Sequence, residues 1–255
     1  MTHRPVRPQP RRARRPARTL AALPLAALLG TAAGCATDGP ETLDARCAVV
    51  VDGSGSADAK TGFDALDKLN KTMVPFLRER HCGSVTFAPI TSASKASPCR
   101  ENRVDLDPPT DATDDVAAIR DEAKLKAVLA ARRMLTCAQQ TNSGSDVLGG
   151  IARGAETLRS GTGKAALLVV SDFEQADKEF TLTAKSIATP EARRTAVDKL
   201  VGPRGVPQLS GMDVYPVGYG MSRRARPSEF PPFDAFWKDI VEGRGKGHVD
   251  DEYQH

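Results

Sequence analysis

The sequence lacks the short motifs that commonly mark enzymes built on parallel sheets. It contains no G-x-S-x-G segment, so the nucleophile turn of an α/β-hydrolase is missing. Neither G-x-x-x-x-G-K-[ST] nor G-x-G-x-x-G occurs, which removes the usual glycine-rich cradles for nucleotide phosphates. No C-x-x-C spacing or histidine–cysteine cluster indicates zinc. A phosphatase centred on Asp52 would need a second acidic residue or a threonine nearby, but Ser54 occupies that position. We therefore expect a binding protein rather than an enzyme.

Acidic residues are absent from the first 18 positions, which hold seven arginines. The apolar stretch that follows, 19–34, is shorter than the ~20 residues that span a bilayer. A basic region, a short apolar region and a small-residue site form the layout of an export signal. The end of this stretch, "TAAGC", resembles a bacterial lipoprotein signal, whose mature chain would begin at a lipidated Cys35. We expect a signal peptide over 1–34, a polar tether over 35–45 and a lipid-anchored, extracytoplasmic protein. Plain secretion is the alternative, and general or twin-arginine export stays open.

An excess of basic residues is confined to that export segment. The whole chain has 36 basic and 32 acidic residues, a formal net charge of +4. Without the seven signal arginines, 29 basic residues face 32 acidic ones, for a net charge of about −3. The charge therefore predicts no nucleic-acid partner.

Four cysteines remain after Cys35: Cys47, Cys82, Cys99 and Cys137. An even set outside the cytoplasm is typical of disulfide bonds. Spacing alone leaves three possible pairings open.

The remaining pattern alternates apolar, strand-like runs with helical periodicity, and it contains no internal repeat. Strands are expected near 46–51, 83–90, 103–107, 164–173 and 212–220, and helices near 63–80, 114–139, 147–159, 190–201 and 233–243. The helix over 114–139 follows a pattern that includes Leu125, Leu129 and Leu135. Alternation of this kind predicts an α/β fold, with one doubly wound, mostly parallel sheet flanked by helices. We expect a single domain over 46–243 and a C-terminal tail over 244–255.

Polar residues gather in three of the expected loops. They are Asp52, Ser54 and Ser56 after the first strand, Ser145 before a helix, and Asp172 at the end of "LLVVSD". In doubly wound sheets, ligands bind beyond the carboxyl ends of the strands. Carboxylates and hydroxyls are hard oxygen ligands that suit Mg²⁺, Mn²⁺ or Ca²⁺. Glycines at 53 and 55 would let the first loop wind tightly. The alternatives are a plain turn at "DGSGS" and helix caps at Ser145 and Asp172.

Three ordered segments, "VVVDGSGS", "GSDVLGGI" and "LLVVSD", resemble the von Willebrand factor A (VWA) domain and its metal-ion-dependent adhesion site. The resemblance implies that the hydroxyls of Ser54, Ser56 and Ser145 coordinate Mg²⁺, with Asp52 and Asp172 holding it through water. It also implies that an acidic side chain of a protein or peptide partner takes an open position. Ser145 stands where the family has threonine, and Thr141 and Ser143 are rivals in the same loop. Phe173 stands where glycine often follows the last aspartate.

The family's sheet order, 3-2-1-4-5 with the third strand antiparallel, implies one disulfide pairing. Cys47 and Cys82 would lie at the edge away from the metal, and Cys99 and Cys137 on the metal side. We therefore expect the bonds Cys47–Cys82 and Cys99–Cys137. The function that follows is divalent-cation-dependent protein binding. The alternatives are a solute-binding lipoprotein, or a VWA-like fold with a structural role and no functional metal site.

Overall fold

The structure is a computed structural model that describes residues 42–57, 63–141 and 144–250. The expected signal peptide, Cys35 and most of the expected tether lie outside these residues. Ser143 and the side chain of Ser56 also lie outside the described part of the chain. The remaining candidate residues can be placed.

One mostly parallel sheet organises the described residues. Its strand order is β3-β2-β1-β4-β5-β6, and only the β2–β3 pair is antiparallel. The strands are β1 (Ala45–Asp52), β2 (Cys82–Ile90), β3 (Val104–Asp105), β4 (Ala165–Val170), β5 (Met212–Val217) and β6 (His248–Val249). Strand order reverses between β1 and β4, so the loops after these two strands lie side by side. The doubly wound fold expected from the sequence is confirmed.

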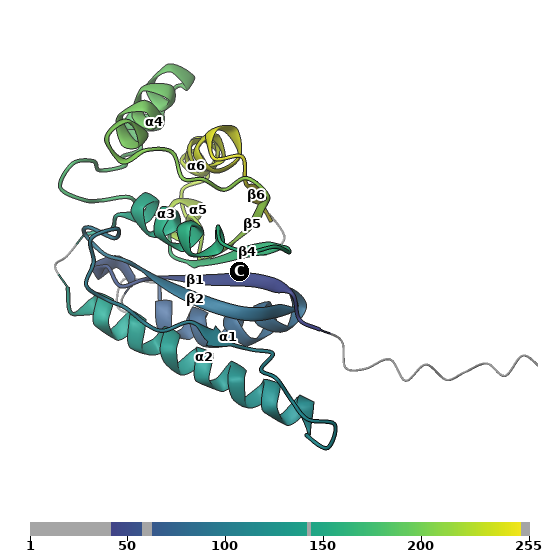
Figure 1. Cartoon of the computed structure of the whole chain (residues 1–255). Coiled ribbons are helices and arrows are strands. Elements are labelled where there is room, and N and C mark those ends of the chain that lie inside the picture. Colours follow the sequence, from purple (N-terminus) through teal and green to yellow (C-terminus); the bar gives the residue numbers. More distant parts are fainter. Residues whose placement is uncertain (1–41, 58–62, 142–143, 251–255) are drawn as a thin grey trace, which may run out of the picture. The chain divides into compact units, whose positions relative to one another are not determined.

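Helices cover both faces of this sheet (Figure 1). They are α1 (Ala65–Glu79), α2 (Val116–Gln139), α3 (Val147–Leu158), α4 (Pro190–Arg204), α5 (Met221–Arg224) and α6 (Phe230–Lys238). The first two pack on one face, whereas α3, α4 and α6 pack on the other. Several helices begin where a side chain accepts a hydrogen bond from the first turn. Asp64 caps α1, Asp115 caps α2 and Asp146 caps α3 in this way.

The strand β1 is buried on both faces because its side chains alternate between two apolar cores. Ala48 and Val50 contribute to the core beneath α3, and Val49 and Val51 to the core beneath α1 and α2. A strand buried on both sides reads as a continuous apolar run, and "CAVVV" is such a run. The polar residue that follows it, Asp52, is therefore carried to the end of the most enclosed part of the sheet.

The inward face of α2 differs from the pattern of large apolar residues seen in the sequence. Leu125 and Leu129 are 63% and 52% exposed. The buried positions are mostly alanines: Ala123, Ala127, Ala130, Ala131 and Ala138, together with Met134 and Leu135. Small side chains let a helix axis approach its neighbour closely, so alanine marks the contact face here. Of the large residues in the helical pattern, Leu135 lies on this face, whereas Leu125 and Leu129 do not.

Two disulfide bonds are present, with the expected pairing. Cys47 joins Cys82 at a Cα–Cα distance of 5.7 Å, and Cys99 joins Cys137 at 5.8 Å. The first bond links the starts of two neighbouring strands. The second links the loop after β2 to the last turn of α2. Disulfide bonds of this kind indicate an oxidising, extracytoplasmic environment.

The C-terminal segment contributes to the fold beyond the boundary expected from the sequence. The closing helix α6 begins at Phe230, and a π-helix over Asp239–Arg244 continues it. Within 244–255, which was expected to be a tail, His248 and Val249 form β6 and pair with Asp213 and Val214. Two residues are too few to show an alternating pattern in the sequence. The strand β6 forms because its backbone pairs with β5.

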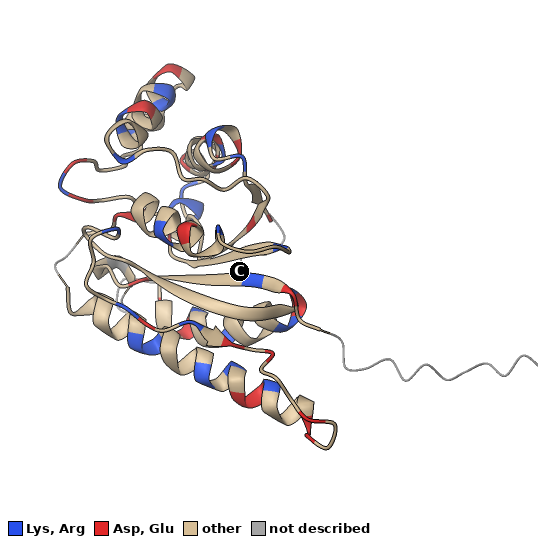
Figure 2. Cartoon of the chain, viewed as in Figure 1, with Lys and Arg blue, Asp and Glu red and all other residues tan. Residues whose placement is uncertain are grey.

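Charged residues gather on the helices and loops, and the strands are mostly free of them (Figure 2). On α2, the acidic residues Asp121 and Glu122 lie near the start and basic residues follow them, and Lys126 pairs with Glu122 at 2.8 Å. Such exposed pairs contribute little to stability.

Candidate metal site at the carboxyl end of the sheet

Asp52 is the most enclosed member of the candidate site. Its side chain is fully buried at the end of β1. Oδ1 accepts a hydrogen bond from the backbone N–H of Ser54 at 2.9 Å, and Oδ2 accepts one from the Ser171 hydroxyl at 2.6 Å. Burial raises the pKa of this carboxyl, and hydrogen bonds from Ser171 and Ser54, together with the nearby Ser145 hydroxyl, only partly oppose the shift. No basic side chain of the described residues forms an ion pair with it.

Ser145 lies in the second loop, and its hydroxyl has no hydrogen-bond partner among the described residues. The residue is only 3% exposed. Its backbone pairs with Ala176, through N–H···O bonds of 2.6 and 2.9 Å. The hydroxyl lies near enough to lower the pKa of Asp52. A buried hydroxyl without a partner costs free energy, so this atom is the one feature of the site that calls for a further ligand.

The capping of α3 falls to Asp146, which leaves Ser145 without that role. Asp146 Oδ1 accepts from the N–H of Gly149 at 3.0 Å, and Oδ2 accepts from the N–H of Ser94 at 3.1 Å. Gln175 also binds the first turn of α3, because its Oε1 accepts a hydrogen bond from the N–H of Leu148 at 3.0 Å. Of the two rivals, Thr141 uses its hydroxyl on the Ala138 carbonyl at 2.6 Å, and Ser143 lies outside the described residues.

Asp172 and Ser54 are both buried at the same edge of the sheet, at 4% and 7% exposure. Asp172 follows Ser171, whose hydroxyl binds Asp52, so the ends of β1 and β4 are joined directly. Oδ1 of Asp172 accepts from the N–H of Glu174 at 3.0 Å, which closes a tight turn rather than capping a helix. Ser171 was not singled out in the sequence, although it stands next to Asp172 in "LLVVSD".

Phe173 explains how this chain manages without the glycine that often follows the last aspartate. Its φ of +63° lies in the left-handed region that favours glycine. Its ring is buried and contacts Tyr219 and Trp237, with centroid distances of 4.9 and 5.4 Å. Its N–H donates to Ser171 Oγ at 2.9 Å, and its carbonyl accepts from Trp237 Nε1 at 3.1 Å. Packing and hydrogen bonds thus hold a large residue in the conformation that the loop requires.

The two glycines of "DGSGS" differ in their roles. A Cβ on Gly53 would lie 2.4 Å from Ala138 Cβ and 2.7 Å from the backbone nitrogen of Gln139. A Cβ on Gly55 would meet nothing within 4 Å. Only Gly53 is therefore required, and its reason is the close approach of α2. Tight winding of the loop is not what requires glycine at position 55.

The donor set fits a hard divalent cation. No three His, Cys, Asp or Glu side chains of the described residues lie close enough together to hold a metal. What the fold brings to one edge are two buried carboxylates and hydroxyls, including the unpartnered one at Ser145. Oxygen ligands of mixed charge suit magnesium, manganese or calcium, and they do not suit zinc or copper.

Comparisons with known proteins leave the family open. No protein-family model matches the sequence, and no curated protein matches it. Among solved structures, the chain is similar to the human COPII-coat protein Sec24c, with 13% identity and a TM-score of 0.35. The match covers 87% of this chain and 30% of Sec24c, so it spans less than a third of that protein. A likeness at this level carries no argument about function.

Proposed function

We propose that this chain is an extracytoplasmic, VWA-like binding domain that recognises an acidic side chain of a protein or peptide partner through a divalent cation. Mg²⁺ is the first candidate, with Mn²⁺ or Ca²⁺ as alternatives. The observation that supports this most is the buried carboxylate of Asp52 beside the unpartnered hydroxyl of Ser145. Each is costly to bury alone. A bound cation would satisfy both and would offer a coordination position to a partner's carboxylate.

Each residue of the site then has a distinct role. Ser54, Ser56 and Ser145 would offer hydroxyl ligands, while Asp52 and Asp172 would hold the ion through water. Ser171 positions Asp52 by donating to Oδ2. Asp146 caps α3 and so leaves the Ser145 hydroxyl available. We propose that this arrangement serves binding rather than turnover, with its carboxylates and hydroxyls assigned to the cation.

The proposed place of work is the outer side of a membrane, with Cys35 as the lipid-bearing residue. The two disulfide bonds support an oxidising compartment. In the described part of the chain, no helix combines the length and apolar character that crossing a membrane requires. Metabolic labelling with a fatty-acid analogue would test the anchor, and it should fail in Cys35→Ala.

Titration calorimetry of Mg²⁺ and Mn²⁺ into the purified protein, with its disulfides intact, tests the metal site. We expect saturable heat for the wild type, none for Asp52→Asn, and at least about tenfold weaker binding for Ser145→Ala. Asp111→Asn is the matched control, because it removes an exposed carboxylate from a loop elsewhere. In EDTA, Asp52→Asn should be as stable as the wild type or more so by about 1 kcal/mol, since it removes a buried charge.

Two results would contradict the proposal. One is the absence of metal heat in the wild type, and the other is an unchanged isotherm in Asp52→Asn. A purely structural Asp52 would show the opposite stability result, with Asp52→Asn clearly less stable in EDTA.

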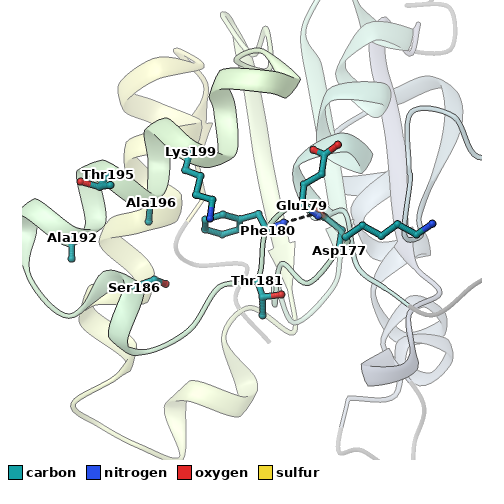
Figure 3. A pocket seen from close by; sticks show the side chains of 10 residues that line it. Asp177, Glu179, Phe180, Thr181, Ser186, Ala192, Thr195, Ala196 and Lys199 are labelled. Carbon is teal, nitrogen blue, oxygen red and sulfur yellow. Dashed lines mark hydrogen bonds between the residues drawn. The ribbon is translucent and has the colours of Figure 1, made fainter.

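A solute-binding role is the second candidate, and one cavity bears on it. It has a volume of about 430 Å³ and lies between the loop after β4 and α4, where Lys199 reaches toward Phe180 (Figure 3). That volume suits a small ligand. Two of its hydroxyls are engaged within the fold, since Thr195 donates to the Glu191 carbonyl and Ser186 to the Thr183 carbonyl. A thermal-shift response to small solutes that is independent of metal and lost in Lys199→Ala would favour this role.

A further inference from the structure

Two arginines on the flank of the sheet donate to the same two backbone carbonyls. Arg100 Nη1 donates to the carbonyls of Ser97 and Cys99. Arg153, on α3, donates from Nη1 to Ser97 at 3.1 Å and from Nη2 to Cys99 at 2.6 Å. Arg153 Nη1 also donates to the Ser94 carbonyl at 2.9 Å. Two guanidinium groups of like charge are therefore held side by side.

Neither guanidinium forms an ion pair with a carboxylate of the described residues. The nearest acids do not compensate the pair. Glu101 is engaged by Arg133 in a two-pronged contact of 2.8 and 3.0 Å. Glu156 raises the pKa of Arg153, yet that pKa is still lowered to about 10, by desolvation first and by Arg100 second. The local surroundings thus contain too little negative charge.

Both arginines line a cavity of about 350 Å³ beside β2, α3 and the 95–101 loop. Lys95 and Glu156 line it too. Lys95 Nζ donates to the Arg204 carbonyl at 2.9 Å and keeps its charge. With Glu101 paired to Arg133, the residues that line the cavity therefore carry three positive charges against the one negative charge of Glu156. This excess matches a doubly charged anion.

The donors left over have the geometry that recognises oxyanions. A guanidinium carries five N–H groups. Three N–H groups of Arg153 donate to backbone carbonyls, so that Nε–H and one Nη2–H have no hydrogen-bond acceptor among the described residues. Both Nη1–H groups of Arg100 donate to backbone carbonyls, which leaves its Nε–H and its Nη2–H groups for a ligand. On each side chain, the remaining Nε–H and Nη2–H groups form the fork that binds two oxygens of a phosphate or sulfate at once.

We infer that this cavity binds a tetrahedral oxyanion, the phosphate or sulfate group of a ligand, between the side chains of Arg100 and Arg153. The site is separate from the candidate metal site. Arg153 lies seven residues after the helix cap Asp146, which is about 10 Å along α3. The carbonyls that hold the two arginines belong to the loop closed by the Cys99–Cys137 disulfide, so the donors are held in place before a ligand arrives.

Calorimetric titration with inorganic phosphate and with inorganic sulfate tests this inference. The protein is titrated at low ionic strength with its disulfides intact and in EDTA, so that the proposed metal site cannot contribute. We expect one saturable site for either anion, and at least about tenfold weaker binding of acetate, which carries a single charge. Arg100→Ala should weaken phosphate binding at least about tenfold. Arg153→Lys should weaken it as well, because it keeps the charge and loses the fork.

Arg194→Ala is the matched control, since it removes an equal charge from the exposed face of α4. It should bind phosphate as the wild type does. The inference is overturned if neither anion gives saturable heat, if acetate binds equally well, or if Arg100→Ala and Arg194→Ala behave alike. A melting temperature lowered in Arg100→Ala without anion binding in the wild type would assign the pair to loop stability alone. Asp52→Ala should bind phosphate normally, so this result is independent of the metal site.

Discussion

Gly53 and Gly55 stand two residues apart in one loop but face very different surroundings. Gly53 lies against the last turn of α2, where a methyl group would overlap Ala138. Gly55 opens a short 3-10 helix, with free space where a side chain would lie. The contact at Gly53 places the loop after β1, which carries part of the candidate metal site, against α2, so a change there acts on the position of Ser54.

We predict that Gly53→Ala and Gly55→Ala separate clearly. Gly53→Ala should lower the free energy of unfolding by about 1–3 kcal/mol, because an overpacked contact forces α2 or the loop to move. It should also weaken Mg²⁺ binding. Gly55→Ala should stay within about 0.5 kcal/mol of the wild type. Urea denaturation and metal calorimetry measure both effects, and equal behaviour of the two variants would contradict this account.

At the scale of elements, α2 links the loop after β1 to one of the two disulfides. Cys137 precedes Ala138, the residue that touches Gly53, and Cys137 is bonded to Cys99. The other disulfide, Cys47–Cys82, joins the starts of β1 and β2, at the opposite end of those strands. The two bonds close loops of similar length, with separations of 35 and 38 residues. The two disulfide bonds therefore close loops of nearly equal length but lie at opposite ends of the sheet.

Replacing each disulfide by two serines should cost similar stability but have different effects on metal binding. The chain-entropy relation gives about 4 kcal/mol for either loop. Removing Cys99–Cys137 should also weaken Mg²⁺ binding, because the last turn of α2 is then free to move from Gly53. Removing Cys47–Cys82 should leave the affinity of the folded protein unchanged. An equal loss of affinity in both variants would show that α2 does not support the site.

At the scale of the whole described unit, the sheet separates two edges with different chemistry. The carboxyl ends of the strands carry the candidate metal site. At the other edge, Tyr215 lines a cavity of about 350 Å³, and the Arg80 guanidinium lies 4.3 Å from its ring centroid. Burial raises the pKa of the Tyr215 phenol to about 12, and Asp213 and Asp250 raise it further while Arg80 opposes them.

This shift predicts a loss of stability at alkaline pH. Tyrosine in the unfolded chain loses its proton near its ordinary pKa of 10, whereas folded Tyr215 keeps it until about 12. The folded state therefore binds more protons between these values, and the free energy of unfolding falls as pH rises through that window. The loss should be on the order of 2 kcal/mol. Rapid urea denaturation at pH 9 and pH 12 should show a smaller fall for Tyr215→Phe, and equal falls would refute the assignment.

Local sequence patterns were sufficient for the strands β1 to β5 and for the edge at which the polar loops gather. The runs "CAVVV" and "LLVV" favoured strands buried on both faces, and parallel strands bring their carboxyl ends together. The placement of Asp52, Ser145 and Asp172 at one edge follows from this. The disulfide pairing followed from the strand order of the VWA domain, which the sequence resembles, because that order assigned each cysteine to an edge.

Only the tertiary structure decided which groups meet across long separations. Ser171 binds Asp52 over 119 positions of sequence, and no local pattern encodes that hydrogen bond. The same holds for Ala138 against Gly53, for the short strand β6, and for Arg100 beside Arg153. Periodicity reports which face of an element is apolar, whereas these contacts depend on how two elements are placed against each other. The sequence by itself thus determined most of the strands and helices and the edge at which the polar loops gather, and packing determined which atoms at that edge have partners.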